Sequence, residues 1–268
     1  MVQGRINNLD NAGGGMKEWF QSLPIVTQYW FGATILFTLA GNFEIVSPKN
    51  FQLIWGNVTE KFEIWRLLTG FCYAGPFHFS TLLSVYLLLT FSQNYESNGP
   101  FNTGAGGGSA DYLFMWLFGA IGMMVSVPVI NLITPFSGRI MCQNMIYYVL
   151  YIWSKRHPMS NSNIWGFPVK AIYLPFVYVA LSIFTGAPYK HMIHGIVIGH
   201  IYYFLVDVVP HVYGKDVLTT PQFLIDQMGV GVYVPAVAPA SGAPTPAQGD
   251  TPRGGHQWGS GGQRLGRS

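Results

Sequence analysis

Apolar residues gather in this chain into six stretches that are long enough to form membrane-spanning helices. A helix needs about 20 mostly apolar residues to cross a hydrocarbon layer about 30 Å thick. The windows lie at residues 25–46, 77–95, 112–134, 139–154, 168–186 and 191–209. We therefore predict an all-α membrane protein in which six transmembrane helices form one bundle.

The second and fourth windows are the least apolar of the six. Gln93 and Asn94 lie in the second, and Arg139, Gln143 and Asn144 lie in the fourth. Polar side chains inside a span are costly in lipid, so they usually face a bundle interior or a hydrated cavity. We expect these to do so, and we expect the short fourth span to extend backward.

A segment of about thirty residues, 47–76, separates the first two windows and mixes polar with aromatic side chains. It is too amphipathic for a linker and too polar to cross a membrane. We predict a structured loop partly immersed in the membrane interface, where Trp55, Trp65 and Tyr73 are favoured.

Hydrophobic periodicity stops at residue 210, and the chain then becomes rich in proline, glycine, serine and alanine. Such a composition is typical of disorder. We divide the chain into an N-terminal segment (1–24), a six-span membrane domain (25–209) and a largely disordered tail (210–268). No apolar core of signal-peptide length occurs in residues 1–24, so we expect membrane entry to begin with the first span.

The positive charges indicate the orientation in the membrane. An even number of spans places both termini on one side, and nine of the fourteen Lys and Arg residues fall on that side. Cytoplasmic loops carry an excess of such residues, so both termini are predicted to be cytosolic. The nine are Arg5, Lys17, Lys155, Arg156, Lys170, Lys215, Arg253, Arg264 and Arg267.

Composition supports a membrane protein and excludes other classes. Charged residues make up 9% of the chain, against about 25% in soluble proteins. The net charge is +3, with no basic cluster dense enough to bind nucleic acid. The two cysteines, Cys72 and Cys142, form neither a disulfide framework nor a zinc spacing.

Gly195 and Gly199 lie one helical turn apart in the sixth window. Their missing side chains allow a neighbouring helix to approach closely, and alone they indicate only a packing motif. Combined with six windows and with Trp65 and Arg66 in the first loop, they resemble the rhomboid superfamily of intramembrane serine proteases.

The residues of an active rhomboid are missing at the matching positions. The resemblance requires a Gly-x-Ser in the fourth span and a histidine three residues before the first glycine, where the base takes the serine proton. The chain has Met192 at the base position and no Gly-x-Ser in its fourth window. Cys142 lies near the place of the nucleophile, but a small buried cysteine is the favoured interpretation. We predict a pseudoprotease, and an intramembrane protease with displaced residues, using Cys142 with His194, stays open.

The histidines of the sixth window could bind a metal, because His191 and His194 share a helix side. A third ligand is missing: His200 falls on the opposite face, and His78 and His211 have no assigned place. A polar-network or interfacial role is therefore favoured, and we predict no metal and no cofactor.

Several segments taken in order resemble the derlins, the catalytically inactive rhomboid branch of the endoplasmic reticulum. The resemblance extends from about Glu18 to Leu224. The segments are EWFQSLPIVTQYW, WRLLTGFCYAGPFHFS, SADYLFMWLFGA, YIWSKRHP, YLPFVYVALS and GIVIGHIYYFLVDVVP.

This resemblance implies a role in endoplasmic-reticulum-associated degradation, in which misfolded proteins move back to the cytosol for ubiquitination. The chain would be part of the retrotranslocation channel in the endoplasmic reticulum membrane. Its implied partners are misfolded substrates, a ubiquitin-ligase membrane complex and the valosin-containing AAA ATPase. Homo- or hetero-oligomerisation and the identity of the substrates stay open. An import role in a plastid-surrounding membrane is the alternative within the same resemblance, and a small-solute transporter is disfavoured because no inverted repeat is visible.

Three groups of residues carry over from the resemblance. Trp65 and Arg66 correspond to a loop motif that engages lipid and substrate, although an interfacial anchor with a snorkelling cation explains them equally. Gly195 and Gly199 correspond to the helix-packing pair. In the tail, the segment 258–266 resembles a peptide that docks the ATPase, with one residue more than expected. Its motif residues are Trp258, Gly259, Leu265 and Gly266.

Overall fold

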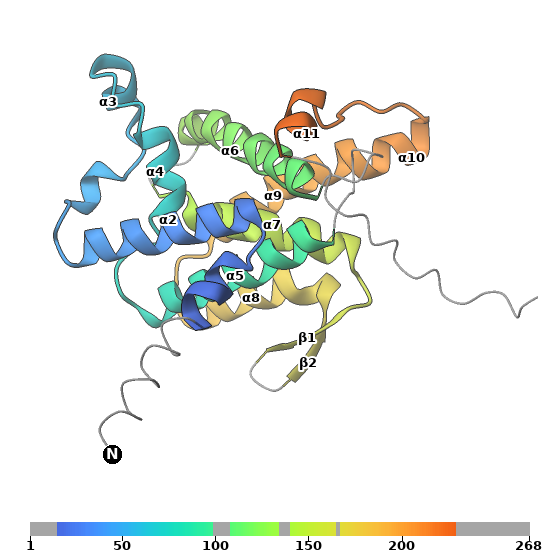
Figure 1. Ribbon diagram of the computed structural model, residues 1–268, viewed down its shortest axis with the longest axis horizontal. Coiled ribbons are helices and arrows are strands. Elements are labelled where there is room, and N and C mark those ends of the chain that lie inside the picture. Colours follow the sequence, from blue (N-terminus) through green and yellow to red (C-terminus); the bar gives the residue numbers. More distant parts are fainter. Residues whose placement is uncertain (1–14, 99–107, 134–139, 165–166, 229–268) are drawn as a thin grey trace, which may run out of the picture. The chain divides into compact units, whose positions relative to one another are not determined.

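The computed structural model describes residues 15–98, 108–133, 140–164 and 167–228, and these are mostly helical (Figure 1). A short helix at 15–21 precedes the first long one. The other α-helices are α2 (Ile25–Asn42), α3 (Trp55–Glu60), α4 (Arg66–Cys72), α5 (Phe79–Ser97), α6 (Gly108–Ile133), α7 (Cys142–Arg156), α8 (Leu174–Phe184), α9 (Lys190–Tyr203), α10 (Val209–Tyr213) and α11 (Gln222–Met228). A π-helix, Phe204–Val208, joins α9 to α10.

Each of the six predicted windows contains a long helix, but two predicted boundaries are wrong. The fourth helix, α7, begins at Cys142 and extends forward to Arg156 instead of backward. The start of the fifth window forms β2 (Phe167–Lys170), which pairs antiparallel with β1 (Asn161–Ile164), so α8 begins only at Leu174. Pro168 lies in this stretch, and proline is disfavoured inside a helix but tolerated on an edge strand.

Two helical stretches among the described residues are long and apolar enough to cross a membrane by length and composition alone. They are Gly108–Leu132 in α6 and Lys190–Tyr213, which joins α9, the π-helix and α10. The stretch Ala171–Phe184 is apolar but shorter. The protein is thus mostly helical with two clear candidate spans, and the count of six spans stays a prediction.

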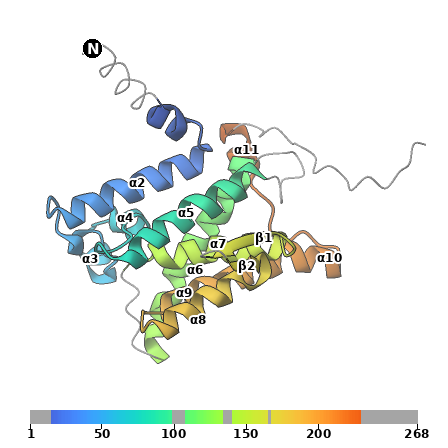
Figure 2. The same cartoon turned by 90° about the horizontal axis from the view of Figure 1, so that it is seen from below.

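Helix α7 lies at the centre of the packed helices, in contact with α5, α6, α8 and α9 (Figure 2). Twelve of its fifteen residues are buried. Its polar residue Asn144 is fully buried, as expected for a polar group that faces the bundle interior. Gln93 of α5 departs from that expectation, because it is exposed.

A buried carboxylate connects the end of α5 to the start of α2. Pro24 precedes α2 and provides no side-chain cap. Instead, Glu96 accepts hydrogen bonds from the backbone N–H groups of Val26 and Thr27, at 3.0 and 2.8 Å, and from the Thr27 hydroxyl at 2.7 Å. A negative charge at a helix N-terminus satisfies free donors and is favoured by the helix dipole. Glu96, about seventy positions further along the chain, therefore caps α2 in place of a local side chain.

Candidate functional site

The first loop, residues 47–76, is organised around the buried side chain of Arg66. Its Nε donates to the carboxylate of Glu63, and its Nη1 donates to the backbone carbonyls of Lys49, at 2.6 Å, and Gln52, at 2.9 Å. We call this group the Arg66 clasp. It ties the beginning of the loop to the start of α4, which a guanidinium can do because its donors point in fixed directions.

The structure differs here from the snorkelling cation that the sequence suggested. The side chain of Arg66 is only 5% exposed, whereas the Glu63 carboxylate is 20% exposed. The hydrogen bond from Arg66 is the main reason why the pKa of Glu63 is lowered from its ordinary value of 4.5. Arg66 is therefore an internal crosslink of the loop, and Trp65 beside it is the exposed member of the pair.

Around the clasp, the loop turns large apolar side chains outward. We call this set the apolar rim: Trp55, Phe62, Ile64, Trp65 and Leu68, of which Phe62 is 77% exposed. The backbone of Phe62 also has a positive φ of 55°, which is rare for a bulky residue. Such strain persists only where the surroundings impose it, and it concentrates at functional positions.

A cavity of about 490 Å³ opens beside the clasp. Both Trp65 and Arg66 line it, together with Phe37 of α2 and with apolar and polar residues from the segment that follows α2. Its mixed lining suits an amphipathic guest, such as an extended peptide or a lipid, better than a purely apolar one. The complete lining is Phe37, Val46, Asn50, Phe51, Glu63, Trp65, Arg66 and Thr69.

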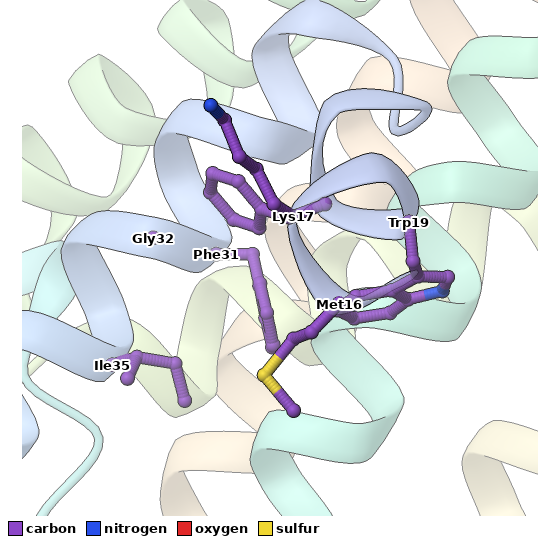
Figure 3. A pocket seen from close by; sticks show the side chains of 7 residues that line it. Met16, Lys17, Trp19, Phe31, Gly32 and Ile35 are labelled. Atoms are coloured by element: carbon purple, nitrogen blue, oxygen red, sulfur yellow. The ribbon is translucent and has the colours of Figure 1, made fainter. Parts of the chain in front are cut away.

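A second, more apolar groove of about 870 Å³ lies where the helix 15–21 meets α2. Figure 3 shows Met16, Lys17 and Trp19 on the short helix, with Phe31, Gly32 and Ile35 on α2. The rings of Trp19 and Phe31 meet edge to face, with centroids 6.3 Å apart. An amphipathic start of this kind suits the membrane interface.

The two glycines of the sixth window face α7. A Cβ atom built on Gly195 would overlap the backbone carbonyl oxygen of Asn144. One built on Gly199 would lie 3.1 Å from Cδ1 of Tyr151 and 3.3 Å from the carbonyl oxygen of Tyr148. The backbones of α7 and α9 therefore approach as closely as such small residues allow.

His194 lies between three helices in a polar network that its sequence position alone did not show. Its Nε2 is 2.7 Å from the Ser126 hydroxyl of α6, and its Nδ1 is 2.6 Å from the Asn144 amide nitrogen of α7. The Ser126 hydroxyl also donates to the carbonyl of Met123, 3.0 Å away. The serine, histidine and asparagine therefore form one network between α6, α7 and α9.

The other residues considered for catalysis have different surroundings. Cys142 is fully buried in the main hydrophobic core. Met192 packs against the same core, and His200 pairs through Nδ1 with the Tyr151 hydroxyl at 2.8 Å. The polar-network interpretation of the histidines therefore holds for His194 and His200.

Some predicted site residues cannot be placed, and some placed residues were not predicted. Trp258, Gly259, Leu265 and Gly266 lie outside the described residues. Ser126, within an apolar window, was missed because a single serine in such a window carries no signal of its partner.

Comparison with known proteins identifies similar sequences over most of the chain. The family model described as the Der1-like family matches residues 23–222. Derlin-1 of Bos taurus is 32% identical over 252 residues, covering 91% of this chain and 96% of the relative. Derlin-1 of Arabidopsis thaliana is 31% identical over 229 residues, covering 84% and 83%. Derlin-2.1 of Zea mays is 31% identical over 216 residues, covering 78% and 84%.

Proposed function

This chain belongs to the Der1-like family of membrane proteins, and we propose that it acts as a pseudoprotease in the retrotranslocation of misfolded proteins. The family is generally linked to endoplasmic-reticulum-associated degradation. Within that role, the chain would form part of the path by which a polypeptide crosses the endoplasmic reticulum membrane. Both termini would face the cytosol, and no cofactor would be required.

The observation that carries this proposal is the first loop. A polypeptide that crosses lipid exposes backbone groups, each of which costs several kcal/mol when unsatisfied. The exposed apolar rim would favour insertion of the loop into the interface, and the clasp would bring a charged pair and two backbone carbonyls with it. A rigid amphipathic loop held this way disturbs the lipid and lowers the local barrier. The mixed cavity beside Trp65 is where an emerging segment would first make contact.

The pseudoprotease part of the proposal is supported by the state of the candidate catalytic groups. Ser126 and His194 are neighbours, but the serine hydroxyl also engages a carbonyl of its own helix, and both side chains belong to a network with Asn144. Cys142 lies in the core. We therefore expect Ser126→Ala and Cys142→Ala to leave the turnover of a misfolded membrane protein unchanged in cells. Purified chain in liposomes should not cleave that substrate, and cleavage that either substitution abolishes would establish the protease alternative.

The sequence of the tail suggests a cytosolic partner. A AAA ATPase would pull on substrate released by the membrane domain, and the segment 258–266 would dock it with Trp258 and Leu265 in pockets. A ubiquitin-ligase complex would act on the same side.

The deciding experiment measures the half-life of a misfolded luminal glycoprotein in cells that lack this chain. Wild type should restore rapid turnover, and a chain ending at Pro239 should restore it only in part, because the membrane domain would lack its ATPase contact. A chain with Ala substituted at Trp258 and Leu265 should behave like the truncation. If wild type itself does not shorten the half-life, the retrotranslocation proposal is wrong.

A further inference from the structure

The segment that follows the last long helix returns to the bundle and docks on α6. Figures 1 and 2 both show α11 beside the first turns of α6. Leu224 and Ile225 of α11 are buried against Ala110. The hydroxyl of Thr220, just before α11, donates to the carboxylate of Asp111.

This docking buries a small cluster that is separate from the main core. Leu224, Ile225 and Ala110 form their own group of fully buried residues, with Leu113, Phe114 and Met228 around it. The preceding stretch, 214–221, contains no helix, and Gly214 ends α10 with a φ of 65°. Elements with few buried contacts and an exposed, non-helical connection open locally at lower free energy than the core does. Release of α11 therefore requires little rearrangement of the bundle.

Thr220 is followed by Pro221, and threonine before proline is the target of proline-directed kinases. We propose that Thr220 is a phosphorylation site and that its phosphate releases α11 from α6. The Thr220 Oγ1 would form a bond to the γ-phosphorus of ATP, the bond from that phosphorus to the oxygen bridging to ADP would break, and the hydroxyl proton would pass to the catalytic base of the kinase. ATP and a proline-directed kinase are the co-reactants.

The surroundings of Thr220 explain why a phosphate would release the segment. Thr220 is 6% exposed and Asp111 is 1% exposed, so a dianionic group does not fit between them. It would lie against the carboxylate that now accepts the hydroxyl proton, and like charges repel strongly where little water screens them. A second carboxylate, Glu96, is connected to the same first turn of α6 through the Ser109 hydroxyl at 2.7 Å. Two carboxylates therefore lie at the first turn of α6, and their negative charge exceeds the partial positive charge of the helix N-terminus.

Because Thr220 is buried when docked, a kinase modifies the released state and then traps it. Release would lengthen the tether between the bundle and the tail by up to about 50 Å, the extended span of the fifteen residues 214–228. The inference rests on the proposed function in one respect, which is that this side of the membrane faces the cytosol.

The test uses the purified full chain in detergent, with ATP and a purified proline-directed kinase, and locates the phosphate by mass spectrometry. Thr245 and Thr251, which also precede proline, serve as internal references for kinase activity. Thr220→Val removes the acceptor, whereas Thr219→Val alters the exposed neighbour and is the matched control. Leu224→Ala loosens the docking and should make phosphorylation of Thr220 about tenfold faster. In phosphorylated wild type, the backbone amides of 222–228 should exchange hydrogen about tenfold faster than in unmodified protein.

Two results would contradict the proposal that phosphorylation of Thr220 releases α11. One is the absence of phosphate on Thr220 even in the Leu224→Ala chain, and the other is a phosphate that leaves hydrogen exchange in 222–228 unchanged. A parallel incubation of sealed microsomes with the cytosolic face outward tests the release of α11 separately from the side of the membrane that Thr220 faces. Phosphate on Thr220 in microsomes supports both the phosphorylation site and its cytosolic placement. Modification in detergent but not in sealed microsomes would contradict the cytosolic placement and with it any regulatory use of the site.

Discussion

Replacement of Gly195 by alanine is expected to be the most destabilising glycine-to-alanine change among the described residues. The added Cβ would overlap the backbone carbonyl oxygen of Asn144, and no side-chain rotation can relieve a clash with backbone. Helix α9 would have to move away from α7, which is the central helix and also contacts α5, α6 and α8. Overpacking of a core costs about 1–3 kcal/mol, and we expect the upper end here. The measurement is thermal unfolding of purified chain, with a fall of roughly 6–12 °C in Tm.

Two glycine substitutions give the scale for that measurement. Gly199→Ala should cost less, because its new contacts at 3.1–3.4 Å include the movable ring of Tyr151. Gly56→Ala, in α3, meets open space and should leave Tm unchanged. If Gly195→Ala unfolds at the same temperature as Gly56→Ala, the close approach of α7 and α9 is absent from the purified chain.

The same change also bears on the polar network of the bundle. His194 directly precedes Gly195 and bonds to Asn144, the residue whose carbonyl would be displaced. Separation of the helices would therefore break the His194–Asn144 contact and leave polar groups unpaired in an apolar interior, where each is costly. Packing and polar satisfaction fail together at this position, which is why a methyl group has so large an effect.

The sequence could predict the features that repeat along one helix. The apolar windows located the long helices, because a helix needs many apolar residues whether it is surrounded by lipid or by a protein core. Gly195 and Gly199 were found because their spacing equals one helical turn. For the same reason the windows could not count the spans: a buried core helix such as α7 and a lipid-exposed helix differ in their neighbours, which the sequence of one helix does not contain.

Features made by residues far apart could not be predicted. The Glu96 cap on α2 joins positions 70 residues apart, and Thr220 meets Asp111 across 109 residues. Neither pairing leaves a local pattern. The burial of Arg66 was missed for a related reason, since its carbonyl partners at Lys49 and Gln52 are ordinary backbone groups that every residue possesses.

Arg66→Ala is expected to release the first loop and to slow the turnover of misfolded proteins by about as much as deletion of the chain. The substitution removes three hydrogen bonds at once. The Glu63 carboxylate and the backbone carbonyls of Lys49 and Gln52 all lose their cationic donor. Because Glu63 is partly exposed, water compensates part of this loss, and we expect the loop to open locally while the bundle stays folded. Hydrogen exchange in 47–66 should rise while the long helices stay protected.

The controls for this prediction distinguish the geometry of the clasp from its charge. Lys61→Ala removes an exposed cation of the same loop and should change neither exchange nor turnover. Arg66→Lys keeps the charge but not the planar fork, so it should fall between wild type and Arg66→Ala. If Arg66→Lys behaves like wild type, or if Lys61→Ala is as defective as Arg66→Ala, positive charge rather than the geometry of the clasp is what the loop requires.

Acid should loosen the same loop in the wild-type chain. Hydrogen bonding to Arg66 lowers the pKa of Glu63 in the folded state. The stability that Glu63 contributes is therefore fully present above its ordinary pKa of 4.5 and is lost as the pH falls through the lower, folded-state value. The protection of the amides in 47–66 of purified wild type, corrected for the intrinsic exchange rate at each pH, should fall below that range. Arg66→Ala should show a smaller fall, because its Glu63 keeps only the Asn57 donor. An acid response of full size in Arg66→Ala would mean that another group, and not the Glu63–Arg66 pair, holds the apolar rim in place.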